Sequence, residues 1–245
     1  MTSVEQSGLP IAIWQRLPKL GSLPRTPDLV LSRSLQPELL DSLPAQSPDA
    51  LHSRRDLRIF NRVMGNPKWV QRQLRRLAQP GETVLELGAG GGELSESLAP
   101  LGLTCAGLDR AARPPTWPPA WPWYQEDLRT FAGWASHPIV LGTLIFHHLD
   151  NDELAQIGRI FDRHARVIVA CEPARQRRWL VAFRGLCRLI RANPVSWHDG
   201  QVSIAAGFHG DELPSLLGLS PDRWTCKTSI SVRGVYRLAA ERTSR

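Results

Sequence analysis

The chain has 245 residues, a net charge of +7, 42% hydrophobic residues and 22% charged residues. These fractions are typical of a globular protein and exclude a disordered or fibrous chain, and the length suits one α/β domain with an appendage. The sequence contains no apolar run of the roughly 18 residues that a membrane-spanning helix needs, and its four cysteines form no CxxC pair. We therefore expect a cytoplasmic protein without a transmembrane segment, a disulfide framework or a metal site.

The positive charge raises the question of a nucleic-acid partner, because basic side chains dominate binding to phosphates. The basic residues are nearly all arginines, and they are spread along the chain instead of gathered in one block. This distribution argues against nucleic acid and favours a small-molecule partner. It leaves the oligomeric state open.

The amino-terminal third divides into two parts. Residues 1–30 contain four prolines and no sustained periodicity, so we expect a poorly ordered lead-in. Over residues 31–79 we predict a helical cap. In this cap, Ser47-Pro48 and Asn66-Pro67 are the start signals of two helices, and Gly65 closes the first of them.

From residue 80 onward, short β-rich runs alternate with helical stretches, which predicts an α/β domain over residues 80–245 with a mostly parallel sheet. The final two runs flank Arg233-Gly234 and indicate a closing antiparallel pair. The predicted strands are Thr83–Leu87, Thr104–Leu108, Trp123–Gln125, Ile139–Ile145, Arg166–Cys171, Trp224–Ser231 and Val235–Ala239.

The first predicted strand runs into a glycine-rich turn, residues 88–92, and then into a helix bearing Leu94 and Leu98. Glycines permit positive φ and close approach of a ligand to the backbone. The third glycine, Gly92, comes one residue earlier than in the GxGxxG motif of nicotinamide dinucleotide enzymes. Glu86, within the strand, would repel a pyrophosphate and attract a cation, so we expect a ligand with positive charge.

Two more acids follow the next two strands. Asp109 comes directly after the second strand, 23 residues beyond Glu86, a spacing at which an acid can accept both hydroxyls of a ribose. Asp127 follows the third strand. Each acid alone fits a helix-capping role, but three acids beside a glycine turn predict a ligand-binding crevice at the carboxyl ends of the strands.

The segment Glu86–Gly92 resembles the glycine motif of class I S-adenosylmethionine-dependent methyltransferases, and the resemblance covers roughly residues 80–240. It implies a Rossmann-like fold with a seven-stranded, mostly parallel sheet, an antiparallel last strand and helices on both faces. It further implies S-adenosylmethionine as cofactor, with Asp109 at the ribose position and Asp127 and Leu128 on the adenine side. The cofactor-binding residues expected on this basis are Glu86, Gly88, Ala89, Gly90, Gly92, Asp109, Arg110, Asp127, Leu128 and Thr143.

The sequence departs from this family after the second strand, where a Pro- and Trp-rich segment, residues 114–123, replaces an ordinary helix. One of its tryptophans could stack on the adenine base. Tryptophans bracketed by prolines more often fill a gap at a domain edge, and we favour that interpretation.

The fourth strand leads into His147-His148-Leu149, a segment that this family commonly places at the substrate-facing end of the strand. Histidine is suited to take a proton near neutral pH, so His147 and His148 are candidate catalytic bases. Helix capping and packing are the alternative. Methyl transfer from a sulfonium can proceed by proximity and orientation alone, which makes a base optional.

A long insertion, residues 174–220, separates the fifth strand from the final pair. Its first part, Arg177–Arg191, has one apolar and one arginine-rich face. Such a helix suits a lid over an apolar substrate, weak contact with an anionic membrane surface or, most simply, packing on the sheet. We expect a loop over Asn193–Gly200 followed by a helix over Ser203–Leu213, with His198 as a third candidate base and Asp199 as its orienting partner.

Together with Ser53–Leu57 and Glu172-Pro173, this insertion resembles a methyltransferase subgroup of bacterial aromatic polyketide or quinone biosynthesis, which implies a role in secondary metabolism. The leading hypothesis is methyl transfer to oxygen or carbon of a small, aromatic or apolar metabolite. The alternatives are an RNA methyltransferase, a non-catalytic S-adenosylmethionine-binding protein and a nicotinamide-dependent oxidoreductase.

Overall fold

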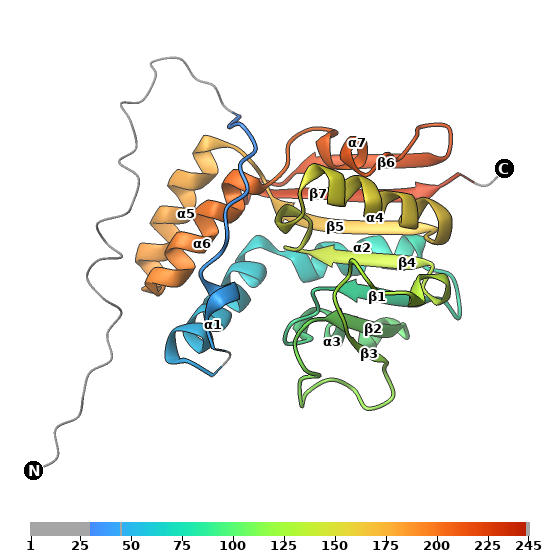
Figure 1. Cartoon of the computed structure of the whole chain (residues 1–245), viewed down its shortest axis with the longest axis horizontal. Helices are drawn as coiled ribbons and strands as arrows, with labels where there is room; N and C mark the ends of the chain where they lie inside the picture. Colours follow the sequence, from blue (N-terminus) through green and yellow to red (C-terminus); the bar gives the residue numbers. More distant parts are fainter. Residues whose placement is uncertain (1–29, 45, 244–245) are drawn as a thin grey trace, which may run out of the picture.

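The computed structural model describes residues 30–44 and 46–243, so the expected lead-in over residues 1–30 lies almost entirely outside the described residues. The described chain forms one twisted sheet with helices packed around it (Figure 1). The strands are β1 (Thr83–Leu87), β2 (Thr104–Asp109), β3 (Trp123–Gln125), β4 (Ile139–Thr143), β5 (Val167–Pro173), β6 (Trp224–Ile230) and β7 (Val235–Arg242).

The sheet has the order β3-β2-β1-β4-β5-β7-β6. Strands β1 to β5 pair in parallel, whereas β7 pairs antiparallel with both β5 and β6. Parallel neighbours need crossover connections, and here the connecting segments contain the helices α3 (Glu93–Glu96) and α4 (Asn151–His164). The predicted mostly parallel sheet with an antiparallel last strand is confirmed.

Successive side chains along each strand point to opposite faces of the sheet, so a hydrophobic core forms on each face. Leu85 in β1 belongs to the core that contains Leu154 of α4. Val84, its neighbour in β1, belongs to the core that contains Val70 of α2 (Asn66–Leu77). The sheet is thus covered on both faces, and α2 is a covering helix of the sheet.

The fourth strand is two residues shorter than predicted. β4 ends at Thr143, and the next residue, Leu144, has φ 57 in the left-handed region. The turn leads directly into the 3-10 helix η5 (Phe146–His148). This left-handed residue breaks the extended backbone that the apolar run Ile139–Ile145 had suggested.

Three helices pack together in one cluster and are called the cap helices: α1 (Pro48–Met64), α5 (Arg177–Ile190) and α6 (Pro194–Ala206). The cap predicted over residues 31–79 supplies only α1 of these, because α2 packs on the sheet. The Ser47 side chain accepts a hydrogen bond from Ala50 N, and Gly65, with φ 73, closes α1 as predicted. Phe60 of α1 packs with Phe183 of α5 in a separate apolar cluster. The apolar face predicted for α5 therefore packs against the other cap helices.

A buried polar network joins α1 to α6. The carboxylate of Asp56 accepts hydrogen bonds from Asn193 N and Ser196 Oγ, at 3.0 and 2.9 Å. The Ser53 hydroxyl lies 3.0 Å from that of Ser196. Because buried polar groups need partners in fixed geometry, this network sets how the two helices meet.

The expected loop over Asn193–Gly200 is wrong, since α6 occupies most of it. The side chain of Asn193 accepts from Ser196 N, and Pro194 occupies the first helical position. The expected helix over Ser203–Leu213 is interrupted as well, because α6 stops at Ala206 and α7 (Glu212–Leu216) begins later. A Cβ on Gly207 would lie 2.1 Å from Pro173 O, which shows how closely the two backbones approach there.

Residues 30–43, which we call the strap, precede α1. Residues 31–38 are irregular instead of helical, and only the short 3-10 helix η2 (Leu40–Ser42) follows, so the predicted helical cap begins later than residue 31. Arg33 donates to Ala206 O and Leu149 O, at 3.0 and 2.7 Å. The strap therefore runs beside the end of α6 and the segment after η5. Within the described ranges, no helix combines the length and apolarity needed to cross a bilayer.

Candidate functional site

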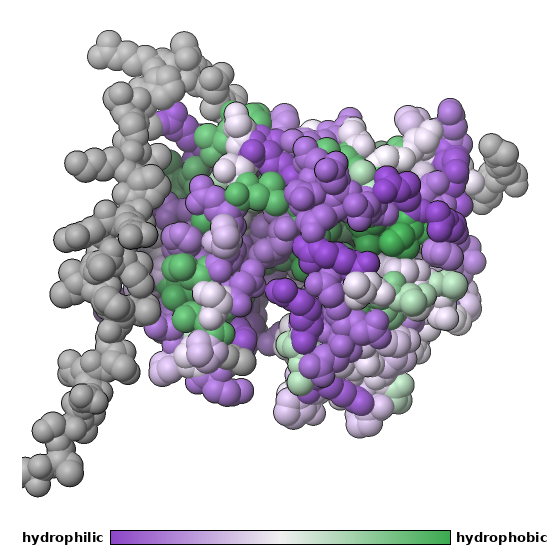
Figure 2. Space-filling view, in the orientation of Figure 1, coloured by the Kyte–Doolittle hydropathy of each residue, from purple (hydrophilic) through white to green (hydrophobic). Residues whose placement is uncertain are grey.

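The carboxyl ends of the parallel strands point toward the cap helices (Figure 1). Figure 2 shows a hollow between the part of the molecule that holds α1 and the loops that follow β2 and β3. Open α/β sheets bind ligands at this edge. The residues predicted to bind cofactor and substrate follow one another along this edge, strand by strand.

The glycine turn after β1 adopts the backbone conformation that only glycine takes readily. Gly88, Gly90 and Gly92 have φ of 62, 52 and 80. Gly88 and Gly90 are exposed, and Ala89 between them is buried. A Cβ on Gly90 would have no nearer neighbour than Gly88 O, at 3.9 Å. The turn thus leaves space over its backbone for a ligand.

Asp109 lies beside this turn, as predicted. Its carboxylate accepts hydrogen bonds from Gly90 N and Ala111 N, both at 2.8 Å. The two bonds hold the carboxylate at the junction of the β1 and β2 ends. Arg110, the next residue, is exposed, and its carbonyl lies 3.5 Å from the Gln125 amide.

Glu86 is buried beneath the turn. Its carboxylate accepts hydrogen bonds from Ser95 N at 3.1 Å and from the Ser95 hydroxyl. Burial raises the pKa of Glu86 to about 7, against the opposing effect of these bonds. Ser95 is a partner that sequence reasoning missed, and the predicted contact of Glu86 with a cationic ligand remains a prediction.

The substitution Glu86→Gln is expected to remove a pH dependence of stability. The folded-state pKa of about 7 lies above the ordinary 4.5, so the unfolded chain releases its proton first and stability falls as pH rises between these values. The penalty at pH 8 is up to roughly 3 kcal/mol. Urea unfolding at pH 5 and pH 8 should show this loss for the wild type relative to Glu86→Gln.

The matched control for this comparison is Glu96→Gln, at an exposed position in the same helix turn region. Its stability should follow the wild-type pH profile. Parallel profiles for the wild type and Glu86→Gln would contradict the prediction.

Asp127 and Leu128 follow β3 along the same edge. Glu126 N donates to Asp109 O at 3.0 Å, which ties this loop to the end of β2. Burial raises the pKa of Asp127, but the hydrogen bonds and charge of Arg129 outweigh it and lower the pKa overall. Leu128 packs against the core. The three acids predicted for the site thus follow or lie in adjacent strands, with Glu86 buried below the other two.

The Pro- and Trp-rich segment contains no helix, as expected. Trp117 is buried, and its ring lies against the glycine turn, where a Cβ on Gly92 would be 2.7 Å from Trp117 Cε3. Its ring also contacts those of Trp121 and Trp123 edge to face. Trp117 therefore fills the space beneath the turn, in line with the gap-filling interpretation.

Thr143, at the end of β4, carries a buried hydroxyl. Its Oγ1 has no hydrogen-bond partner among the described residues. A buried polar atom without a partner costs free energy unless a ligand or water satisfies it. Among the described residues the Thr143 hydroxyl is one of six such buried atoms, and it lies at the carboxyl end of a parallel strand, where a ligand would bind.

His147 lies in η5, almost fully buried. Its Nδ1 is 2.6 Å from Glu172 Oε2, and the same carboxylate accepts from Ile145 N and Phe146 N. Burial lowers the pKa of His147, but the carboxylates of Glu172 and Glu38 outweigh it and raise the pKa to about 9. With no other ligand bound, His147 is therefore in its charged, doubly protonated form at neutral pH.

His148 is less buried and stacks against His147, with ring centroids 4.3 Å apart. Burial and the charge of His147 lower its pKa. Both rings approach Glu38 of the strap. Sequence reasoning missed Glu38, because nothing in its local sequence links it to residues more than a hundred positions away.

His198 and Asp199 form the predicted pair, with Nδ1 and Oδ1 2.9 Å apart. The carboxylate also accepts from Leu39 N and Leu40 N, at 2.8 and 2.9 Å. Asp199 therefore holds the strap as well as the histidine. A catalytic role for His198 remains a prediction.

An ion pair joins the cap to the glycine turn. Arg58 of α1 lies 3.5 Å from Glu93, the first residue of α3. Both side chains are about half exposed, so the pair contributes little to stability. It does show that α1 reaches the start of the helix after the turn.

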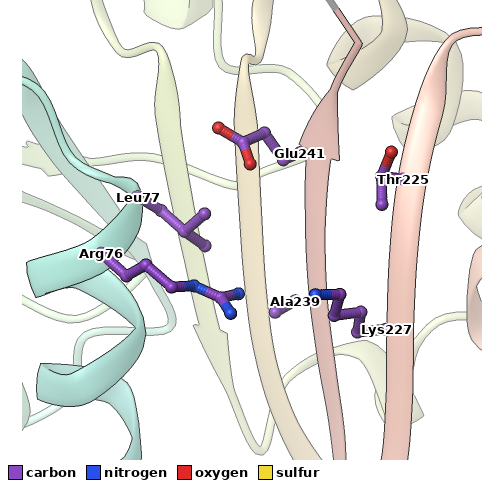
Figure 3. A pocket seen from close by; sticks show the side chains of 6 residues that line it. All are labelled: Arg76, Leu77, Thr225, Lys227, Ala239 and Glu241. Atoms are coloured by element: carbon purple, nitrogen blue, oxygen red, sulfur yellow. The ribbon is translucent and has the colours of Figure 1, made fainter.

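A separate pocket of about 260 Å³ lies on the far side of the sheet (Figure 3). It is lined by the end of α2 and by strands β6 and β7, and its β7 residues, Ala239 and Glu241, pair with the amino-terminal half of β5. Ligands of parallel sheets bind at the opposite, carboxyl edge. This pocket is therefore distinct from the candidate site.

Comparison with solved structures identifies the architecture. The plantazolicin methyltransferase BpumL in complex with SAH aligns with a TM-score of 0.64 at 10% identity, over 84% of this chain and 93% of that chain. The magnesium protoporphyrin IX methyltransferase ChlM from Synechocystis PCC 6803 with bound SAH aligns with a TM-score of 0.52 at 18% identity, over 77% and 86%. This chain has the fold of class I methyltransferases.

Comparison by sequence finds no related family or curated protein. No protein-family model matches the chain. No curated protein matches it either. At identities of 10% and 18%, the two methyltransferases show the fold but not the residues that bind a ligand.

Proposed function

We propose that this protein is an S-adenosylmethionine-dependent methyltransferase that acts in the cytoplasm on oxygen or carbon of a small, aromatic or apolar metabolite. The observation that carries the proposal is the position of Asp109, bonded to Gly90 N where β1 and β2 end. The buried, unpartnered Thr143 hydroxyl supports a ligand at the same edge. The solved structures that share the fold hold SAH, the product of such a donor.

The residues present fit this cofactor. Asp109 would accept the ribose hydroxyls, with Arg110 beside it, and Asp127 and Leu128 would flank the adenine. The turn residues Gly88, Ala89, Gly90 and Gly92 would lie against the amino-acid portion of the cofactor, with the buried carboxyl group of Glu86 close by. S-adenosylmethionine, when bound, supplies an activated methyl group on its sulfonium, and these residues hold and orient it.

The acceptor would bind between the strand ends and the cap, with the insertion 174–220 as a lid. A small acceptor is supported by the similar structures, which are named for plantazolicin and magnesium protoporphyrin IX. Because His147 holds its proton at neutral pH, a general base would be sought first in His148 or His198.

Binding of SAH to the purified chain tests the cofactor assignment. Calorimetry should give a saturable one-to-one complex, and a thermal shift with SAH should exceed that with NAD, since a ligand at 100 times its Kd adds about 2.7 kcal/mol. A larger shift with NAD would favour an oxidoreductase and sink the proposal.

Labelled donor tests the reaction. Incubation with a crude metabolite extract should transfer label to a small molecule. Label appearing instead in added RNA, with steep salt dependence, would favour the RNA methyltransferase. Cofactor binding with no labelled product from either source would favour the non-catalytic binding protein.

A further inference from the structure

Three potential metal ligands converge where the strap meets the end of β4. Glu38 comes from the strap, and His147 and His148 come from η5. One ligand atom from each side chain lies within 4.8 Å of the others. All three are at least partly buried, with side-chain exposures of 13%, 3% and 30%. Partial burial distinguishes this cluster from the solvated acid clusters of ordinary surfaces.

The separations of both histidines from Glu38 are close to those of side chains that share one ion. His147 Nε2 and His148 Nε2 lie 3.4 and 3.9 Å from the same oxygen, Glu38 Oε1. Charge-assisted hydrogen bonds are about 2.7–2.9 Å long. Two ligands of a tetrahedral ion with bonds of about 2.0–2.1 Å are roughly 3.3–3.4 Å apart. A small inward movement of His148 would complete such a site.

Neighbouring polar side chains hold the three potential ligands in position. Glu172 holds His147 Nδ1 at 2.6 Å, which turns Nε2 toward Glu38. A carboxylate on the far nitrogen is the usual support of a metal-binding histidine. Ser203 Oγ donates to Glu38 at 2.5 Å, and Asp199 fixes the backbone of the strap next to it.

We propose that Glu38, His147 and His148 bind one divalent transition-metal ion, with Zn²⁺ the best match. Two imidazoles and one carboxylate are a ligand set of zinc sites that keep a fourth position for an oxygen ligand such as water. The ion joins the strap to the end of β4, beside the glycine turn that Ile145 contacts. The expectation of no metal site rested on cysteine spacing, which is blind to this cluster. In this site His148 is a metal ligand, which leaves His198 as the candidate general base; the metal site itself does not depend on the proposed methyl transfer.

The competing explanation is a metal-free ion-pair network in which His147, protonated on both ring nitrogens, bridges Glu172 through Nδ1 and Glu38 through Nε2. Both explanations place the same side chains together. They differ in whether the full-length chain takes up a stoichiometric ion and whether His148 contributes to that uptake. His148 is the informative position, because ion pairs between a protonated His147 and the carboxylates of Glu38 and Glu172 do not need it.

The test is a titration of chelator-treated full-length protein with Zn²⁺ by calorimetry and with Co²⁺ by visible absorption. We expect one ion per chain and the intense d–d bands of a low-coordinate Co²⁺ site. His148→Ala and Glu38→Gln should each weaken binding by at least about 10-fold, since even second-layer losses cost 10- to 100-fold. His164→Ala removes an exposed histidine of α4 and should leave binding unchanged.

Each outcome decides the proposal. Sub-stoichiometric binding, or equal affinity of the wild type and His148→Ala, would overturn it. SAH binding, measured in the same variants, should persist in His148→Ala and Glu38→Gln, so loss of the metal can be told apart from loss of the cofactor site or of the fold. Asp199→Asn, which loosens the strap without removing a ligand, should weaken Zn²⁺ binding by about 10- to 100-fold.

Discussion

Asp109→Ala is expected to weaken SAH binding by at least about 100-fold. A carboxylate that accepts two ribose hydroxyls makes two charge-assisted hydrogen bonds, each of about 1.5–3 kcal/mol. The substitution also removes the acceptor of Gly90 N and Ala111 N, which loosens the turn itself. Calorimetric titration with SAH measures the change.

The control for this substitution is Asp222→Ala, at an exposed position before β6, which should bind SAH as the wild type does. Asp109→Asn retains one oxygen acceptor and should lose less affinity than Asp109→Ala. Unchanged affinity of Asp109→Ala, with an intact circular dichroism spectrum, would reject the ribose contact and with it the proposed orientation of the cofactor.

Gly158→Ala is expected to lower the free energy of unfolding by about 3 kcal/mol or more, and the melting temperature by roughly 6–12 °C. Gly158 lies in α4, where a Cβ would be 1.9 Å from Leu217 O. That oxygen belongs to the backbone that caps α7, so no side-chain rotation relieves the clash. The helix α4 must move away from α7 and from the core between them. Urea denaturation and thermal unfolding monitor the loss.

Gly185→Ala is the matched control, because Gly185 also lies inside a helix, α5, and a Cβ there would have no neighbour within 4 Å. This substitution should raise the free energy of unfolding by about 0.5–1 kcal/mol, the helix propensity difference between alanine and glycine. The two substitutions are expected to change the free energy of unfolding in opposite directions, which separates the steric effect at Gly158 from the helix-propensity effect at Gly185. A Gly158→Ala variant as stable as the wild type would contradict the packing of α4 on α7.

Much of the sheet was predictable because local periodicity and turn signals agree with the fold. The start of β1 and its glycine turn follow from Thr83–Leu87 and the glycines after it. The end of β4 was not predictable, since the left-handed Leu144 looks like any other apolar residue in sequence. The start of α6 carried a helix signal, Asn193-Pro194, that we took for a loop. Asparagine followed by proline is an N-cap and first-turn signal, so the loop prediction there was wrong.

The residues of the candidate site that follow strand ends could be predicted from the sequence. Those that come together only through contacts between distant segments could not. Asp109 lies at the turn because adjacent parallel strands end together. Glu38 reaches His147 only because Asp199 and Ser203 of α6 hold the strap, a contact between distant segments. Patterns in a single sequence describe residues that are close along the chain, so they do not predict a contact between distant segments such as Glu38 and His147.

The reversed strand β7 has a consequence for how the molecule comes to be made. β6 joins the sheet only through β7, which lies between it and β5. During synthesis from the amino end, β6 leaves the ribosome before β7, the strand that links it to the rest of the sheet. Trp224 and the other residues of β6 have no pairing partner during that interval. The far edge of the sheet can therefore assemble only once Val235–Arg242 has emerged, so β6 is an unpaired strand until then.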